Sequence, residues 1–304
     1  MMLTKPSEIK LNIAGYEIIP IPTGLFGLDG GAMFGTVPKV LWEKTNPTDD
    51  QNRIQMEARG LLLKNTETKR NILIDTGNGS DFVAKYGEKL GASFAKMYNV
   101  DQSGPSLLKS LKKYDLEPSD ITDVILTHLH FDHAGGATMM NSYKEIAPTF
   151  PEAVYYLQRE NYNTAKNPNR REKASYFPAN YEPLLKNGNL KLLEGDQKNL
   201  LPGISVKVSN GHTQGHQMVI VEDGAHRLVY CGDVVPTSTH VRSAWVMGYD
   251  LNPLLLIEEK RALMSANKNK PTYYFFEHDP YCDLASIEES GDDYRVKERF
   301  LLAP

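Results

Sequence analysis

Short apolar runs separated by turn residues recur along the chain, and most of them have the length of strands. The clearest lie at residues 16–21, 54–63, 71–75, 124–126, 153–157, 205–208, 218–221, 227–231 and 273–276. Two other segments predict helices. Leu107, Leu108 and Leu111 recur at helical spacing, and Asn252 with Pro253 starts a helix that runs to about residue 266. Strands interleaved with helices predict an α/β sandwich, two sheets covered by helices.

Two segments lack a clear period. Residues 24–37 are glycine-rich and predict a loop. Residues 161–189 are rich in Asn, Pro, Tyr and charge, and we interpret them as a loop or cap insertion. Loops of this length are uncommon inside a compact domain and often shape a binding site.

Histidines and aspartates cluster where the predicted strands end. Five of the eight histidines belong to this set, and four of its members fall within the run THLHFDH at 127–133. The set comprises His128, His130, Asp132, His133, His212, Asp233 and His278. Imidazole and carboxylate together suit zinc and similar divalent ions. Because the ligands are spread from 128 to 278 and must converge, we predict a single domain over residues 1–304.

The spacing of the set predicts two metal positions. In an extended segment, residues two apart point the same way, so His128, His130 and Asp132 would share one side and His133 would reach a second position. The expected ligands are His128, His130 and His212 for one ion and Asp132, His133 and His278 for the other, with Asp233 bridging both. A hydroxide held between two such ions is a nucleophile at neutral pH.

We expect two divalent metal ions. Zinc is the ion that the ligands favour most, and iron, manganese or cobalt could bind to the same ligands in its place. Structural zinc sites are usually closed and rich in cysteine. This set contains no cysteine, which favours a catalytic site over a structural metal.

The composition limits the classes of binding partner and the cellular compartment that we expect for this protein. A net charge of −4 without a basic stripe gives no indication of a nucleic-acid partner. Two cysteines in 304 residues predict no disulfide framework and a reducing compartment. No apolar run reaches the roughly 18 residues of a membrane span, and the first residues lack the pattern of a signal peptide. We therefore expect a cytoplasmic protein without a membrane partner.

The motifs resemble those of the metallo-β-lactamase superfamily. The matching segments are LIDTG at 73–77, THLHFDH at 127–133, GHTQGH at 211–216, Gly232 with Asp233, and His278. The resemblance implies the αββα sandwich, two mixed sheets flanked by helices, and a dinuclear zinc site with the ligands named above. It also implies that Asp75 and His216 orient ligands from behind.

Three segments, 29–42, 232–240 and 245–253, look like the branch of N-acyl homoserine lactonase-like, quorum-quenching enzymes of the YtnP type. The implied reaction is opening of a lactone ring, with the bridging hydroxide attacking the carbonyl. Asp132 and Asp233 are the residues expected to take part in catalysis, Asp132 by ferrying a proton to the leaving oxygen. The partner is then a small lactone or ester, and the family likeness makes a homodimer plausible.

The chain departs from better-known lactonases at Pro236, which replaces a tyrosine three residues after the bridging aspartate. Thr237 and His240 lie close in sequence and are candidates for the substrate contact. Met33 and Phe34 are candidates for lining an acyl slot, because the glycines beside them let that loop approach a site closely.

Two other readings stay open. An arylesterase or an organophosphate triesterase would use the same ligands, since both reactions attack an electrophilic centre with metal hydroxide. A catalytically inert metal-binding protein is the non-enzyme alternative, although such proteins typically lose ligands and here the set is complete.

Overall fold

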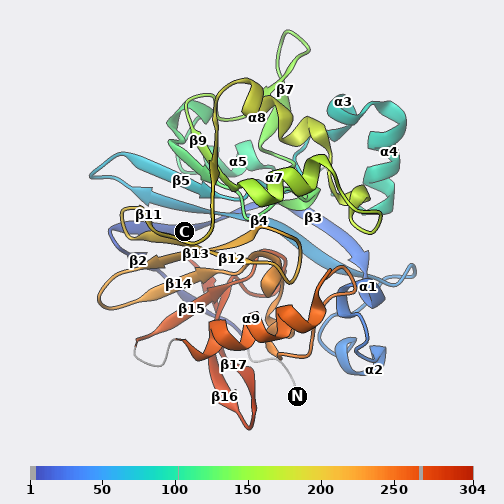
Figure 1. The fold of residues 1–304 in the computed structure, drawn as a ribbon, viewed down its shortest axis with the longest axis vertical. Helices are drawn as coiled ribbons and strands as arrows, with labels where there is room; N and C mark the ends of the chain where they lie inside the picture. Colours follow the sequence, from blue (N-terminus) through green and yellow to red (C-terminus); the bar gives the residue numbers. More distant parts are fainter. Residues whose placement is uncertain (1–4, 102, 267–269, 304) are drawn as a thin grey trace. The chain divides into compact units, whose positions relative to one another are not determined.

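The computed structural model describes residues 5–101, 103–266 and 270–303 (Figure 1). The chain forms a mixed α/β fold with two large mixed sheets and flanking helices. It divides into two compact units. The first unit contains the residues up to 15, residues 27–56 and the residues from 196 onward, and the second contains residues 16–26 and 57–195. The single domain expected from the sequence stays a prediction.

The first unit is built on an eight-stranded sheet. In order across the sheet, the strands are β1 (Ser7–Ile9), β17 (Asp293–Leu302), β16 (Leu284–Ser290), β15 (Thr272–Phe275), β14 (Arg227–Tyr230), β13 (His216–Glu222), β12 (Ile204–Ser209) and β11 (Gln197–Leu201). A short strand, β2 (Asn12–Ile13), precedes the Ala14-Gly15 turn. The strands β14 and β15 are parallel, and α9 (Pro253–Ser265) lies between them in sequence. Such a crossover brings their carboxyl ends to the same edge of the sheet.

One face of this sheet packs on α9. Met218 and Ile220 alternate along β13 toward the same buried cluster as Leu256 and Leu263 of the helix. The two-residue period of the strand therefore meets the helical period of α9 in one core. The orange helix runs along the strands of this unit in Figure 1. The hairpin of β16 and β17 turns at Gly291, whose φ of 67° is costly for other residues.

A buried lysine ties α9 to the loop beside it. The ammonium of Lys260 donates to the backbone oxygens of His240, Arg242 and Trp245 at 2.6, 2.9 and 2.8 Å. Its side chain is fully buried, and burial lowers the pKa of Lys260 to about 7. The loop that contains η5 (Ser238–Val241) is thus held by three hydrogen bonds to one side chain.

The second unit contributes six strands to the other large sheet. They are, in order, β10 (Leu190–Leu193), β9 (Val154–Gln158), β6 (Asp123–Ile125), β5 (Arg70–Ile74), β4 (Arg53–Asn65) and β3 (Tyr16–Asp29), the last two continuing past the boundary of the unit. The central strands β5, β6 and β9 pair in parallel, and nearly all of their residues are buried. Parallel strands that are buried on both faces have continuous apolar sequences. These strands could therefore be predicted from their apolar runs.

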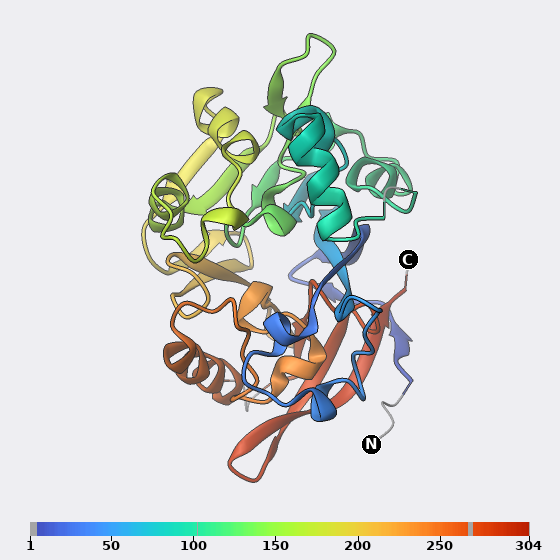
Figure 2. The ribbon, with the colours of Figure 1, turned by 90° about the vertical axis from the view of Figure 1, so that its right-hand side faces the viewer.

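Helices cover this sheet from one side. Leu107 and Leu111 of α5 (Leu107–Lys112), Tyr162 of α7 (Arg159–Lys166) and Leu184 of α8 (Glu182–Lys186) share a core with the strands. Two further helices, α3 (Phe82–Tyr86) and α4 (Glu88–Met97), pack through an aromatic cluster. They are the teal helices in the turned view of Figure 2. The strands β7 (Thr138–Met140) and β8 (Ile146–Pro148) form a small two-stranded sheet of their own.

The predicted strands and both predicted helices are confirmed, and two predicted loops are wrong in part. Residues 24–29 continue β3, and the glycine-rich stretch after them folds as α1 (Gly30–Phe34), with α2 (Lys39–Trp42) following. Residues 161–189 include most of α7, the turns η2 (Lys173–Ser175) and η3 (Pro178–Asn180), and α8. Their helices are too short for a period to emerge from the sequence. The role of this segment as a cap stays a prediction.

Among the described residues, none of the helices combines the length and the apolar character needed to cross a bilayer.

Replacing Lys260 by methionine should lower the free energy of unfolding by about 3 kcal/mol, because three backbone carbonyls lose their buried donor while the side chain keeps a similar volume. Chemical denaturation of the two proteins measures the difference. The matched control is Lys297→Met on β17, an exposed lysine, which should change stability by less than about 0.5 kcal/mol. Equal midpoints for Lys260→Met and the native protein would show that these bonds do not stabilise the fold.

Candidate metal centre

In the first unit, three predicted ligands follow three strands at the same offset. His212, Asp233 and His278 each lie three residues beyond the last residue of β12, β14 and β15. These strands run in the same direction, and Tyr230 and Phe275 are register partners. The sheet therefore delivers all three side chains to one edge.

The Asp233 carboxylate lies between the two imidazoles. Its Oδ2 is 3.2 Å from Nε2 of His212, and its Oδ1 is 3.2 Å from Nε2 of His278. All three side chains are buried. Two ligands of one tetrahedral zinc ion, each at about 2.1 Å from it, are roughly 3.4 Å apart. The spacing on either side of the carboxylate matches that of a shared metal ligand.

A second carboxylate fixes the His212 ring. Nδ1 of His212 is 2.8 Å from Oδ1 of Asp250, whose Oδ2 accepts from the backbone N–H of Met247 at 2.6 Å. Burial raises the pKa of Asp250, and the His212 hydrogen bond opposes that rise. A proton on Nδ1 leaves the Nε2 lone pair toward Asp233, which is the orientation that a metal ligand needs. Asp250 is a residue that our sequence reasoning missed, although it lies within the 245–253 segment.

The backbone around these ligands is also held by side chains. Nε2 of His216 accepts from the backbone N–H of Asp233 at 3.1 Å. Glu259 of α9 accepts from the backbone N–H groups of Asn210 and Gly211, just before His212. His216 was expected to orient a ligand, and its contact is with the main chain of Asp233.

In the second unit, Asp75 organises the start of the THLHFDH run. Its Oδ1 accepts from the backbone N–H of Thr127 and its Oδ2 from the Thr127 hydroxyl, both at 2.7 Å, and Oδ2 is 3.0 Å from Nδ1 of His133. Asp75 adopts a left-handed backbone conformation with φ of 53°, uncommon for a residue other than glycine. The contact places the second nitrogen of His133 away from Asp75, as a carboxylate behind a metal-ligating histidine does.

Three imidazoles gather in this unit. The centroid of the His128 ring lies 4.4 Å from that of His130 and 4.0 Å from that of His133. All three rings are buried. Asp132 is buried beside them, with Oδ1 at 3.9 Å from Nε2 of His133. Four nitrogen and oxygen donor groups in one buried cluster suit a divalent cation.

The expected alternation of these ligands is wrong beyond His130. Residues 131–134 form a helical turn, α6 (Phe131–Ala134), so Asp132 does not continue an extended segment. The turn is fixed by Thr76, whose N–H and hydroxyl both donate to the backbone oxygen of His133 at 2.7 and 2.8 Å. His133 follows Asp132 within this turn, so both reach the cluster from one helical turn.

The 161–189 segment reaches His130 within the same unit. Nε2 of His130 is 3.8 Å from Oε2 of Glu172, and the ring of Tyr176 lies 4.8 Å from the His130 ring. Tyr176 also donates its hydroxyl to Glu172 at 3.2 Å. Glu172 was missed from the sequence, because nothing in its neighbourhood distinguishes it from surface glutamates.

The four predicted substrate-lining residues of the first unit all pack internally. His240 is fully buried, with Nδ1 at 2.8 Å from the Thr237 hydroxyl and Nε2 at 2.8 Å from the backbone oxygen of Met33. Phe34 stacks on its ring with centroids 4.5 Å apart. Burial lowers the pKa of His240 to about 3, which keeps the ring neutral. These contacts give each residue a role in packing, and a contact with substrate stays a prediction.

Comparison with known proteins agrees with this chemistry. The sequence profile of the Metallo-beta-lactamase superfamily matches residues 61–278. An N-acyl homoserine lactonase of Bacillus cereus is 30% identical over 217 residues, which are 68% of this chain and 76% of that protein.

Solved structures extend the likeness to nearly the whole chain. A probable metal-dependent hydrolase from Staphylococcus aureus is 29% identical and matches with a TM-score of 0.83 over 97% of this chain and 99% of that one. AidC, a dizinc quorum-quenching lactonase, matches at 19% identity with a TM-score of 0.74 over 98% and 99% of the two chains, a likeness of fold. With two buried sets of histidine and aspartate side chains suited to divalent ions, the chain belongs to the Metallo-beta-lactamase superfamily and is a metal-dependent hydrolase.

Proposed function

We propose that this hydrolase opens the ring of N-acyl homoserine lactones, using two bound divalent cations. The observation that carries the proposal is the Asp233 carboxylate, whose two oxygens each approach a different imidazole at 3.2 Å. A carboxylate that serves two separate ligand sets is the arrangement of a bridge between two ions. The 30% identity to an N-acyl homoserine lactonase supports the choice of substrate.

The proposed ligands come from both units, which would then act as one functional domain. They are His128, His130 and His212 for one ion, Asp132, His133 and His278 for the other, and Asp233 for both. Zinc is the metal we expect, and iron, manganese or cobalt are compatible with the same donors.

Divalent cations held by these residues would supply Lewis acidity toward the ester carbonyl and would lower the pKa of water enough to make hydroxide available at neutral pH. The side chains of the protein transfer the proton and orient the ligands. The Asp132 carboxylate would accept the proton of the hydroxide that has added to the carbonyl carbon and deliver it to the ring oxygen as the C–O bond breaks, which leaves a carboxylate and an alcohol. Asp75 and Asp250 keep the His133 and His212 rings in a fixed tautomer.

A phenol in the second unit is our candidate for the substrate contact that Pro236 cannot make. Tyr98 follows α4, packs on Phe131 with centroids 4.7 Å apart and is only half-buried. Burial raises the pKa of Tyr98, and the Asp132 carboxylate adds to the rise. The phenol therefore stays protonated near Asp132 and is able to donate a hydrogen bond to the substrate carbonyl or amide.

An arylesterase or a phosphotriesterase would use the same ligands, and an inert metal-binding protein would keep the metals without turnover. Metal analysis and a panel of lactones, aryl esters and phosphotriesters on one preparation separate the three. We expect about two metal equivalents and the largest kcat/KM on N-acyl homoserine lactones. A preference for another ester class would sink the lactonase assignment, and two metals without any turnover would favour the inert protein.

Asp233→Asn should remove both cations together, because the shared bridge loses its charge. We expect total metal to fall well below one equivalent per chain and lactone turnover to fall at least about 100-fold. Asp292→Asn, an exposed aspartate in the β16–β17 turn, is the matched control and should keep both properties. Retention of one full equivalent by Asp233→Asn would argue against a bridge.

Asp250→Asn should weaken metal binding about 10- to 100-fold, because His212 loses the carboxylate that orients it. Added zinc should restore most of the turnover, since Asp250 touches the ligand and not the substrate. A titration of apoprotein with zinc measures the affinity, and turnover at saturating zinc measures the rescue. Unchanged zinc affinity would deny Asp250 a positioning role.

Tyr98→Phe should reduce kcat/KM on lactones by about 10- to 100-fold without altering metal content, because one hydrogen-bond donor is lost. Tyr86→Phe is a control from the same aromatic cluster, since the Tyr86 hydroxyl already donates to Asn180 at 2.9 Å. Equal kinetics for Tyr98→Phe and the native protein would remove Tyr98 from the mechanism.

A further inference from the structure

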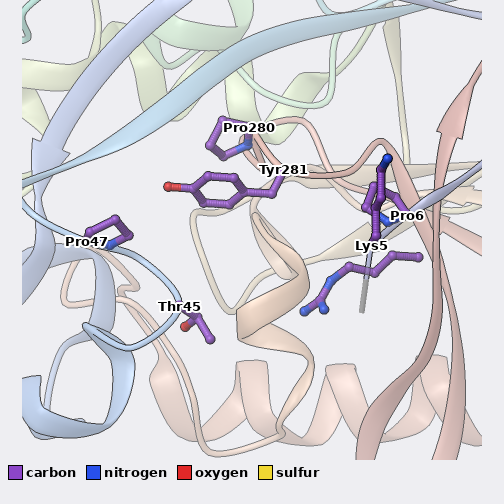
Figure 3. Close-up of a pocket in the computed structure, with 7 residues that line it drawn as sticks. Lys5, Pro6, Thr45, Pro47, Pro280 and Tyr281 are labelled. Atoms are coloured by element: carbon purple, nitrogen blue, oxygen red, sulfur yellow. The ribbon is translucent and has the colours of Figure 1, made fainter. Parts of the chain in front are cut away.

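The first unit contains a cavity that the proposed reaction does not use. It has a volume of about 490 Å³, within the range of small-molecule sites. Four separate segments line it: the residues before β1, the loop after α2, the loop after β15, and β17. The lining residues are Lys5, Pro6, Thr45, Pro47, Pro280, Tyr281 and Arg299 (Figure 3).

The sheet itself brings the two cations of the cavity together. The strand β1 pairs in parallel with β17, and Ser7 is the register partner of Phe300. The residues just before each of these, Pro6 and Arg299, therefore lie opposite one another, and Lys5 precedes them. No carboxylate is among the lining residues.

The guanidinium of Arg299 is the strongest sign of a ligand. Arg299 is only 9% exposed, and the one hydrogen bond of its side chain within the described part of the chain is from Nε to the Ser238 hydroxyl, at 3.3 Å. Neither Arg299 nor Lys5 forms an ion pair with any described residue. A guanidinium has five N–H donors in a planar fork that matches a carboxylate. A buried cation with most donors unused is costly unless an anion pairs with it.

Other buried cations of this chain are satisfied, which makes Arg299 distinct. Lys260 has three carbonyl acceptors. Lys85 donates to Thr138, Gly135 and Asn180 and pairs with Asp81. The fold thus provides acceptors where a buried cation is structural, and does not provide them at Arg299.

The remaining walls are apolar. Figure 3 shows the Tyr281 ring beside Pro280, with its hydroxyl directed toward the side of Pro47. Three proline rings and one aromatic ring offer flat hydrocarbon surface, and the phenol and the Thr45 hydroxyl add hydrogen-bonding groups. Inorganic phosphate would leave these rings exposed to water. A carboxylate that carries a hydrocarbon chain would cover them.

We propose that this cavity is a binding site for an amphiphilic organic monocarboxylate, with the carboxylate on the Arg299 fork beside Lys5 and the apolar body on Tyr281 and the prolines. None of the residues that line the site is a proposed metal ligand or catalytic residue, and the proposal does not rest on the lactonase assignment.

Octanoate is a suitable probe, and calorimetric titration of the full-length, metal-loaded protein measures its affinity. We expect binding of one octanoate in this cavity, at least about tenfold tighter than 1-octanol and inorganic phosphate. Arg299→Met should weaken octanoate at least about tenfold. Arg295→Met is the matched control, because Arg295 lies four residues away on β17 and is paired with the exposed Glu288.

Two further variants keep the test decisive. Arg299→Lys preserves the charge without the fork and should bind with intermediate affinity, which guards against misfolding of Arg299→Met. Tyr281→Ala should weaken octanoate but not acetate. If octanoate binding survives Arg299→Met and disappears in Asp233→Asn, the carboxylate occupies the metal centre and the proposal fails. Equal affinity for phosphate and octanoate also overturns it.

Discussion

The Asp233 carboxylate between two imidazoles is the contact that joins the three candidate ligands of the first unit. A buried anion is costly unless charged or hydrogen-bonding groups surround it. Here His212 and His278 approach its two oxygens, and His216 accepts from its backbone N–H. None of these partners is a neighbour in sequence, so the sheet must supply them. Strands of the same direction, each followed by a ligand at the same offset, supply them without any special loop.

In each of the two units, a buried carboxylate fixes the orientation of a histidine ring. Asp75 holds His133 through Nδ1, and Asp250 holds His212 through Nδ1, at 3.0 and 2.8 Å. Both carboxylates are buried and both receive backbone N–H groups as well. The ring orientation is therefore set by the folded main chain before any ion arrives, and less ordering is left to accompany binding.

The gathering of histidine and aspartate side chains at the sheet edges was predictable because each of these residues follows an apolar run that has the length of a buried strand. His212, Asp233 and His278 gave this signal from the sequence alone. Asp250 and Glu172 did not, since each matters through a tertiary contact and lies in a segment without a period. Lys260 was hidden for a related reason. A lysine on a helix normally indicates a solvent-exposed position. Only the fold reveals the three backbone carbonyls that accept hydrogen bonds from the buried ammonium.

The path of the chain between the units has a consequence for synthesis. The polypeptide passes from one unit to the other after residues 15, 26, 56 and 195. Every residue of the second unit has therefore been translated when residue 195 is complete, whereas the first unit still lacks most of its sheet. The strand β1 must wait for its partner β17, which follows all the other described strands in sequence. A nascent chain can thus fold its histidine-rich unit once residue 195 has been made, while β1 stays unpaired until β17 has been translated.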